Sequence, residues 1–188
     1  MKPSQLFKDK VFLTKKILKH RIPNELFKEI KTMVDLAEKK KNSKYYFLLE
    51  HENNGKNSYQ ISVDNNFFEQ SFIYGYLIKL GECYSGFKIK ERNIRIRRNH
   101  DHYDHYDLWV NFAEKDSENT PHSHSGYLSG VIYYTDCFNA PTIFDDLAYY
   151  GKPRDVLIFP SGLEHEVKKY PGPKTRISLA FNLYSTRQ

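Results

Sequence analysis

Three histidines in the last third of the chain have the types and spacing of a metal site. His122 and His124 are two residues apart, and His165 follows in a later segment. Residues i and i+2 of a β-strand point to the same face, so the first two imidazoles can lie side by side. A third imidazole from another strand could then complete the site, because imidazole is a common ligand of transition metals. The sequence therefore predicts a metal centre made of His122, His124 and His165.

An arginine and a serine beyond the third histidine could hold an anionic ligand beside this metal. Arg176 and Ser178 are also two residues apart. A guanidinium group can bind a carboxylate through two parallel hydrogen bonds. Iron(II) accepts imidazole and carboxylate ligands and keeps positions open for oxygen and a co-substrate. The combination makes an iron-dependent oxygenase the first hypothesis.

Residue 124 departs from the usual iron site, which has two histidines and one carboxylate. An imidazole at this position leaves the site more positive than an acid would. Asp145 or Asp146, which follow Ile143 and Phe144, could instead supply an acidic ligand or a hydrogen-bond partner for a ligand. Both alternatives stay open at this stage.

The elements that must position these residues are short strands in the second half of the chain. Seven short strands within about 100 residues are typical of a sandwich or jelly roll. The predicted strands are Phe87–Arg97, Tyr106–Phe112, Leu128–Thr135, Pro141–Phe144, Val156–Phe159, Glu164–Val167 and Arg176–Tyr184.

The first half of the chain predicts helices that support these strands. An amphipathic helix is expected from Pro23 to about Lys40, with Asn24 as its cap. A second helix is expected over Phe67–Lys79, with Gly81 just past its end. The remaining predictions in this half are a strand over Tyr45–Leu49 and a turn over Asn53–Asn57.

No linker-like segment separates the two halves, so we expect one domain over residues 1–188. Its predicted class is mainly β with α: residues 1–86 form a helical and strand support, and residues 87–188 form a jelly-roll core, a double-stranded β-helix, with the metal site.

Composition and charge exclude several other classes of protein. The chain has 188 residues and a net charge of +6, but much of the excess is lysine near the N-terminus. Alternation around the Arg92–Arg98 cluster fits an exposed strand, so nucleic-acid binding is not expected. No signal peptide or membrane-length apolar run is present, and Cys83 and Cys137 match no metal or redox spacing. These features predict a cytoplasmic protein with reduced thiols.

The order of several motifs resembles that of the 2-oxoglutarate/iron(II)-dependent oxygenases, in particular bacterial and phage members related to prolyl hydroxylases. The motifs span Trp109 to Asn182. They are Trp109-Val110-Asn111, Pro121-His122-Ser123-His124, Leu128-Ser129-Gly130-Val131-Ile132-Tyr133-Tyr134, Leu157-Ile158-Phe159-Pro160-Ser161 with His165, and Arg176-Ile177-Ser178-Leu179-Ala180-Phe181-Asn182.

This resemblance implies a jelly roll that binds Fe(II) at its open end through His122 and His165, with residue 124 where the family has Asp or Glu. Arg176 would pair with the distal carboxylate of 2-oxoglutarate and Ser178 would donate a hydrogen bond to it. The implied reaction is a dioxygenase hydroxylation that uses molecular oxygen and releases succinate and CO2. A protein or peptide side chain is the first expected substrate, and a small molecule is the alternative.

The sequence also suggests roles for other residues and two alternative functions. Asn111 and Tyr133 could reach the co-substrate from inside the barrel, whereas we expect Trp109 to serve packing and the histidine-rich tract Asn99–Asp107 to be a polar loop or strand edge. The alternative functions are a non-catalytic cupin-like binding or assembly module and, from the basic patch, a nucleic-acid demethylase. The sequence does not fix the oligomeric state.

Overall fold

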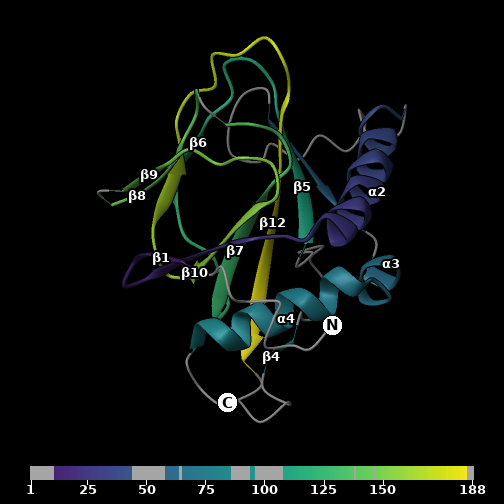
Figure 1. Cartoon of the computed structure of the whole chain (residues 1–188). Helices are drawn as coiled ribbons and strands as arrows, with labels where there is room; N and C mark the ends of the chain where they lie inside the picture. The colour runs from purple at the N-terminus through teal and green to yellow at the C-terminus, as the bar shows by residue number, and fades with distance from the viewer. Residues whose placement is uncertain are drawn as a thin grey trace.

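The protein is described from a computed structural model that covers residues 11–43, 58–63, 65–85, 94–95, 108–137, 139–145 and 147–185 (Figure 1). The helices in these ranges are α2 (Asn24–Lys41), α3 (Asn65–Glu69) and α4 (Phe72–Ser85). The strands are β1 (Val11–Thr14), β2 (Ile17–Arg21), β3 (Ser58–Ser62), β4 (Ile94–Arg95), β5 (Leu108–Ala113), β6 (Asn119–His122), β7 (Leu128–Tyr133), β8 (Thr142–Phe144), β9 (Leu147–Tyr149), β10 (Asp155–Pro160), β11 (His165–Val167) and β12 (Arg176–Ser185).

The described strands form two antiparallel sheets that enclose an interior. The larger sheet has the order β1-β2-β10-β7-β12-β5-β3, with β4 paired to β12, and the smaller has the order β6-β11-β8-β9. Apart from the pairs β1-β2 and β8-β9, neighbours in both sheets are distant in sequence, so the chain passes repeatedly between the sheets (Figure 1). This is the predicted mainly-β jelly-roll class, and it is confirmed.

Two clusters of apolar side chains cover the two faces of the larger sheet. On the outer face, α2 and α4 bury Ile30, Met33 and Leu77 against strand residues such as Val110 and Leu179 (Figure 1). A smaller cluster fills the interior between the sheets. It consists of Ile17, Tyr133, Cys137, Phe144, Leu157 and Phe159. Alternation along each strand supplies both layers, because successive side chains point to opposite faces.

The helices differ from the prediction in two details. Pro23, not Asn24, is the N-cap residue of α2, and its carbonyl accepts the Phe27 N–H at 3.0 Å. The single helix predicted over Phe67–Lys79 is instead α3 followed by α4. The chain turns at Ser71, whose N–H and hydroxyl both donate to the Phe68 carbonyl, and the second helix then restarts. Gly81 is a buried residue within α4 rather than a residue past its end.

The predicted strands in the second half are present with shifted ends, but five strands were not predicted. These are β1, β2, β3, β6 and β9. The two-residue turn that connects β1 and β2 is Lys15-Lys16. It lacks the Gly or Asn of common hairpin turns, so the sequence did not indicate a hairpin there. Of the predicted Phe87–Arg97 strand only Ile94–Arg95 is described. The predictions for Tyr45–Leu49, Asn53–Asn57, Tyr106, Asp146 and the Asn99–Asp107 tract lie outside the described residues.

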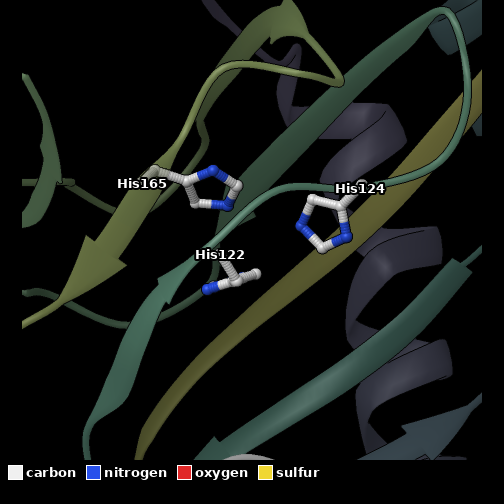
Figure 2. A group of neighbouring side chains, drawn as sticks. All are labelled: His122, His124 and His165. Atoms are coloured by element: carbon white, nitrogen blue, oxygen red, sulfur yellow. The ribbon is translucent and has the colours of Figure 1, made fainter.

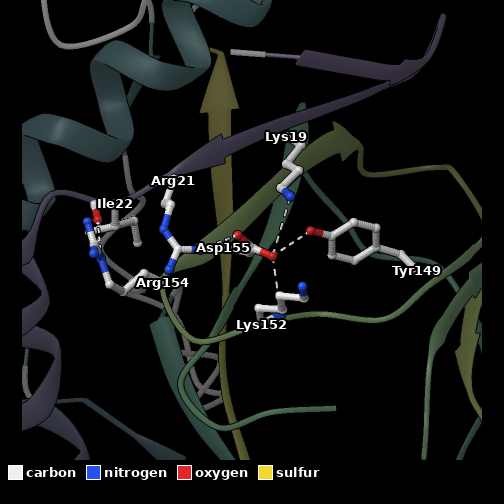
Figure 3. A network of polar contacts seen from close by, with 7 residues as sticks. All are labelled: Lys19, Arg21, Ile22, Tyr149, Lys152, Arg154 and Asp155. Carbon is white, nitrogen blue, oxygen red and sulfur yellow. Dashed lines mark hydrogen bonds and ion pairs between the residues drawn. The ribbon is translucent and has the colours of Figure 1, made fainter. Parts of the chain in front are cut away.

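A buried carboxylate joins the two sheets at the strand β10. Asp155 is fully buried and accepts hydrogen bonds from the Tyr149 hydroxyl at 2.6 Å and the Lys152 N–H at 3.1 Å (Figure 3). Arg21 pairs with its other oxygen at 3.2 Å and Lys19 lies at 3.6 Å. Since Tyr149 belongs to β9, this network fixes the smaller sheet against the larger one.

Cys83 and Cys137 are both free, as predicted. Among the described helices, none combines the length and the apolar character needed to cross a membrane.

Candidate metal centre

Two of the three predicted histidines face each other across neighbouring strands of the smaller sheet. His122 ends β6, His165 begins β11, and the antiparallel register pairs these two residues directly. Their ring centroids are 4.5 Å apart. Directly opposed residues on one face of an antiparallel pair bring their side chains close together. The sheet register therefore positions this imidazole pair.

The third histidine reaches the pair from a loop. The sequence placed His122 and His124 on one strand, but β6 ends at His122, so His124 lies just beyond it. The His124 N–H donates to the Ser161 carbonyl at 2.9 Å, and the Ser161 N–H donates to the Tyr127 carbonyl at 3.3 Å. Ser161 thus holds both ends of the turn that carries His124.

A buried chain of side-chain hydrogen bonds anchors this turn to the larger sheet. The Ser129 hydroxyl donates to Asn182 Oδ1 at 2.7 Å, so its oxygen can only accept from the Ser161 hydroxyl, 2.8 Å away. All three side chains are buried. The loop histidine is therefore tied to strands β7 and β12 through Ser161.

The three rings form one cluster that could hold a metal ion (Figure 2). Their ligand nitrogen atoms all lie within 4.8 Å of one another. The Nδ1 atoms of His122 and His165 lie 2.7 Å from the Thr120 carbonyl and 3.0 Å from the Leu163 carbonyl. A carbonyl only accepts, so each Nδ1 carries the proton and each Nε2 is left with a free lone pair. This tautomer suits metal ligation.

Burial keeps two of these imidazoles neutral. Burial, together with the neighbouring His165 and His122, lowers the pKa of His124 to about 4. Burial and, to a smaller extent, His122 lower the pKa of His165 to about 4, although its hydrogen bond to Leu163 acts in the opposite direction. Metal ions bind the neutral form of imidazole, so both rings are ready to bind at neutral pH.

Aromatic side chains form the wall behind the cluster. Phe144 stacks on His165 with centroids 5.5 Å apart, and Phe159 meets the same ring edge-on at 4.9 Å. Trp109 approaches His124 from β5, with centroids 5.8 Å apart. Trp109, which the sequence assigned to packing, in fact lines the cavity. These rings give the histidines an apolar surrounding on one side.

The same cavity contains the predicted anion-binding residues. It is lined by Gln60, Trp109, Asn111, Asn119, His122, His124, Gly130, Val131, Tyr133, Thr142, Phe159, His165, Val167, Arg176, Ser178 and Ala180. Arg176 is only 5% exposed, and one of its terminal nitrogens donates to the Ala140 carbonyl at 3.1 Å. Its Nε has no partner among the described residues, and no described acid pairs with it. A buried guanidinium with an unused donor fits a carboxylate ligand.

A row of polar side chains crosses the larger sheet beside Arg176. The register aligns Gln60, Asn111, Ser178 and Tyr133 on four adjacent strands, β3, β5, β12 and β7. Asn111 is buried and its Oδ1 has no hydrogen-bond partner within the described structure. The structure therefore brings Asn111, Tyr133 and Ser178 into one cavity with Arg176.

Thr142 is a cavity residue that the sequence did not reveal. The Tyr133 hydroxyl donates to Thr142 Oγ1 at 2.8 Å, and both side chains are buried. This hydrogen bond orients the threonine hydroxyl and uses the only donor of the tyrosine side chain. No local motif identifies Thr142, because its partner comes from a different sheet.

Of the two acidic alternatives, Asp145 does not join the cluster, and Asp146 lies outside the described residues. Asp145 is exposed and is not among the grouped potential ligands. Among the described residues the candidate donor set is therefore three imidazoles, which suits iron, zinc, nickel or copper by ligand type. A site with three protein ligands leaves further coordination positions for a co-substrate and oxygen.

Comparisons with known proteins agree with this arrangement. A family model described as "Putative 2OG-Fe(II) oxygenase" matches residues 140–182, which include His165, Arg176 and Ser178. No curated protein matches the chain by sequence. The predicted resemblance is thus confirmed over this segment, and Fe(II) and 2-oxoglutarate, the predicted cofactors, are those of the matching family.

Two solved structures with a TM-score of 0.59 show the same fold at low sequence identity. A prolyl-4-hydroxylase from Pseudomonas putida has a TM-score of 0.59 and 12% identity, with 99% of each chain covered. HygX from Streptomyces hygroscopicus, with nickel, 2-oxoglutarate and hygromycin B bound, has a TM-score of 0.59 and 10% identity over 98% of this chain and 87% of HygX. An oxidoreductase of the 2OG-Fe(II) oxygenase family from Burkholderia pseudomallei is 17% identical over 56% of this chain, at a TM-score of 0.42; the match spans half of that protein.

Proposed function

We propose that this chain is an Fe(II)- and 2-oxoglutarate-dependent dioxygenase that hydroxylates a protein or peptide side chain, with a small molecule as the alternative substrate. One observation carries the proposal: a cluster of three imidazoles and a buried arginine with an unused donor line the same cavity. The family match over residues 140–182 supports it.

His122, His124 and His165 would hold the iron. The carbonyls of Thr120 and Leu163 keep the two strand histidines in the tautomer that ligates through Nε2. Bound iron supplies the oxidative decarboxylation of 2-oxoglutarate by molecular oxygen, with release of succinate and CO2 and transfer of one oxygen atom to the substrate. The residues around the iron would bind and orient the co-substrate and would exclude water from the site.

Arg176 would bind the distal carboxylate of 2-oxoglutarate. The Ala140 carbonyl holds one edge of the guanidinium, which leaves Nε for the carboxylate. Ser178 would donate a second hydrogen bond, and Asn111 and Tyr133 would line the space along the co-substrate. Because these side chains are buried, hydrogen bonds to them would be stronger than at the surface.

The experiment is anaerobic addition of Fe(II) and then 2-oxoglutarate to the purified protein, followed by the metal-to-ligand charge-transfer absorbance. We expect the wild type to develop the band, His165→Ala to abolish it and Arg176→Ala to weaken 2-oxoglutarate binding by about 100-fold, since a charged buried hydrogen bond is lost. Succinate formation in air, without added substrate, would support turnover.

His20 provides a matched control. It is also a buried histidine, but its Nδ1 lies 2.6 Å from the Tyr76 hydroxyl on the helix-covered face, away from the cavity. His20→Ala should keep the band if the variant remains folded by circular dichroism. A wild-type protein that binds neither iron nor 2-oxoglutarate would exclude the proposed function.

A further inference from the structure

Trp109 has a property that packing alone does not explain. It is the single tryptophan of the chain and lies on β5, with its ring next to His124. Its indole Nε1 is buried, yet it has no hydrogen-bond partner among the described residues. A buried N–H without an acceptor costs roughly 1–3 kcal/mol, so such groups are rarely left unpaired.

Neither neighbouring strand pairs the indole N–H. The register partners of Trp109 are Ala180 on β12, which has no polar side chain, and Ser62 on β3, whose hydroxyl does not accept from the indole. Ala180 lines the cavity with Trp109. An acceptor on a molecule bound in the cavity would pair this N–H.

The charge of the metal cluster indicates what that acceptor is. All three grouped ligands are histidines, whose imidazoles carry no negative charge as metal ligands, and no described carboxylate joins them. An oxygen ligand on the metal would then carry the negative charge of the site, and charged acceptors form the strongest hydrogen bonds. Such an oxygen could belong to a metal-bound water or hydroxide, or to a carboxylate of the co-substrate.

We propose that Trp109 is a positioning residue, and that its Nε1–H donates a hydrogen bond to an oxygen ligand of the metal beside His124. The inference rests on the proposed function and adds to it a residue that orients the oxygen ligand. Trp109 thereby supplies a directional contact at a site where no protein carboxylate is a ligand.

The single indole allows a direct test in the wild-type protein. A ¹⁵N-labelled sample gives one indole N–H signal, which is followed after addition of Zn(II) and then of 2-oxoglutarate, with binding of each measured separately by calorimetry. A downfield shift with Zn(II) alone assigns the acceptor to a metal-bound water or hydroxide. A shift only after 2-oxoglutarate assigns it to the co-substrate carboxylate. A signal that stays in place although both ligands bind would overturn the proposal.

A variant gives a second, independent measurement. Trp109→Phe keeps an aromatic ring but removes the N–H, so we expect metal affinity to stay within about twofold and the affinity of the oxygen ligand to fall about tenfold. Tyr134→Phe is the matched control, because Tyr134 packs on Phe27 of α2, with ring centroids 5.5 Å apart. Unchanged 2-oxoglutarate affinity and an unchanged charge-transfer band in Trp109→Phe would contradict a co-substrate acceptor. Absence of metal binding in the wild type would instead count against the proposed function itself.

Discussion

His122 and His165 are a directly opposed residue pair across the antiparallel strands β6 and β11, with ring centroids 4.5 Å apart. The hydrogen bonds of a sheet fix the distance and direction of these two rings. His124 has no such support and depends on the backbone contacts of its turn with Ser161. The cluster therefore combines a strand-fixed pair with a third ligand whose identity can be tested by substitution.

Replacing the loop ligand by an acid should strengthen iron binding. We expect His124→Asp to raise Fe(II) affinity about tenfold, because a carboxylate adds a direct charge interaction with the cation. Anaerobic Fe(II) titration measures this effect. His124→Asn is the control, since it has nearly the same shape as Asp but no charge, and it should bind iron more weakly than wild type. Equal affinities for Asp and Asn would show that residue 124 does not contact the metal.

The metal-free protein should lose stability as the pH falls from about 6.5 toward 4. The pKa values of His124 and His165 are lowered to about 4 in the folded protein, so the unfolded chain binds protons first. The stability held by these two neutral rings is fully present above pH 6.5 and is lost over that interval, by roughly 1–2 kcal/mol for each ring after allowance for solvent. Urea unfolding at several pH values measures this loss. His165→Gln should flatten the profile, and an equally steep profile would contradict the assignment.

Arg176 is expected to favour function at the expense of stability. It is a buried cation without an acidic partner among the described residues. Arg176→Met should therefore raise the unfolding free energy of the ligand-free protein by about 1 kcal/mol. The same variant should show no thermal shift with 2-oxoglutarate, whereas the metal-loaded wild type is stabilised by ligand binding. A variant less stable than wild type would indicate that Arg176 has a mainly structural role.

Two glycines should respond oppositely to alanine. A methyl group at Gly130 would collide with the ring of Phe181 and lie 2.7 Å from the Leu157 carbonyl oxygen, all within the sheet. Gly130→Ala should cost about 2–3 kcal/mol. Gly75 lies in α4 with nothing within 4 Å of an added Cβ, so Gly75→Ala should stabilise by about 0.5–1 kcal/mol. Thermal and urea unfolding of both variants measure the contrast.

The sequence was sufficient for the class of fold because most core strands are apolar and end in clear turns. Strands such as β3 and β6 were missed, since Ser58–Ser62 and Asn119–His122 are mostly polar and become strands only through pairing with β5 and β11. The position of His124 beyond a strand end was missed for the same reason. Trp109 was interpreted as packing because an unpaired indole N–H is visible only when its neighbours are known.

The two ends of the cavity belong to different sheets. His122 and His165 project from the smaller sheet, whereas Arg176 and Ser178 project from the larger one. Packed sheets lie about 10 Å apart, and side chains from both narrow the gap between them. In the proposed function, a diacid held by both the metal and Arg176 would have to span that gap. The separation of the sheets would then favour diacids of one length over those with one carbon more or fewer.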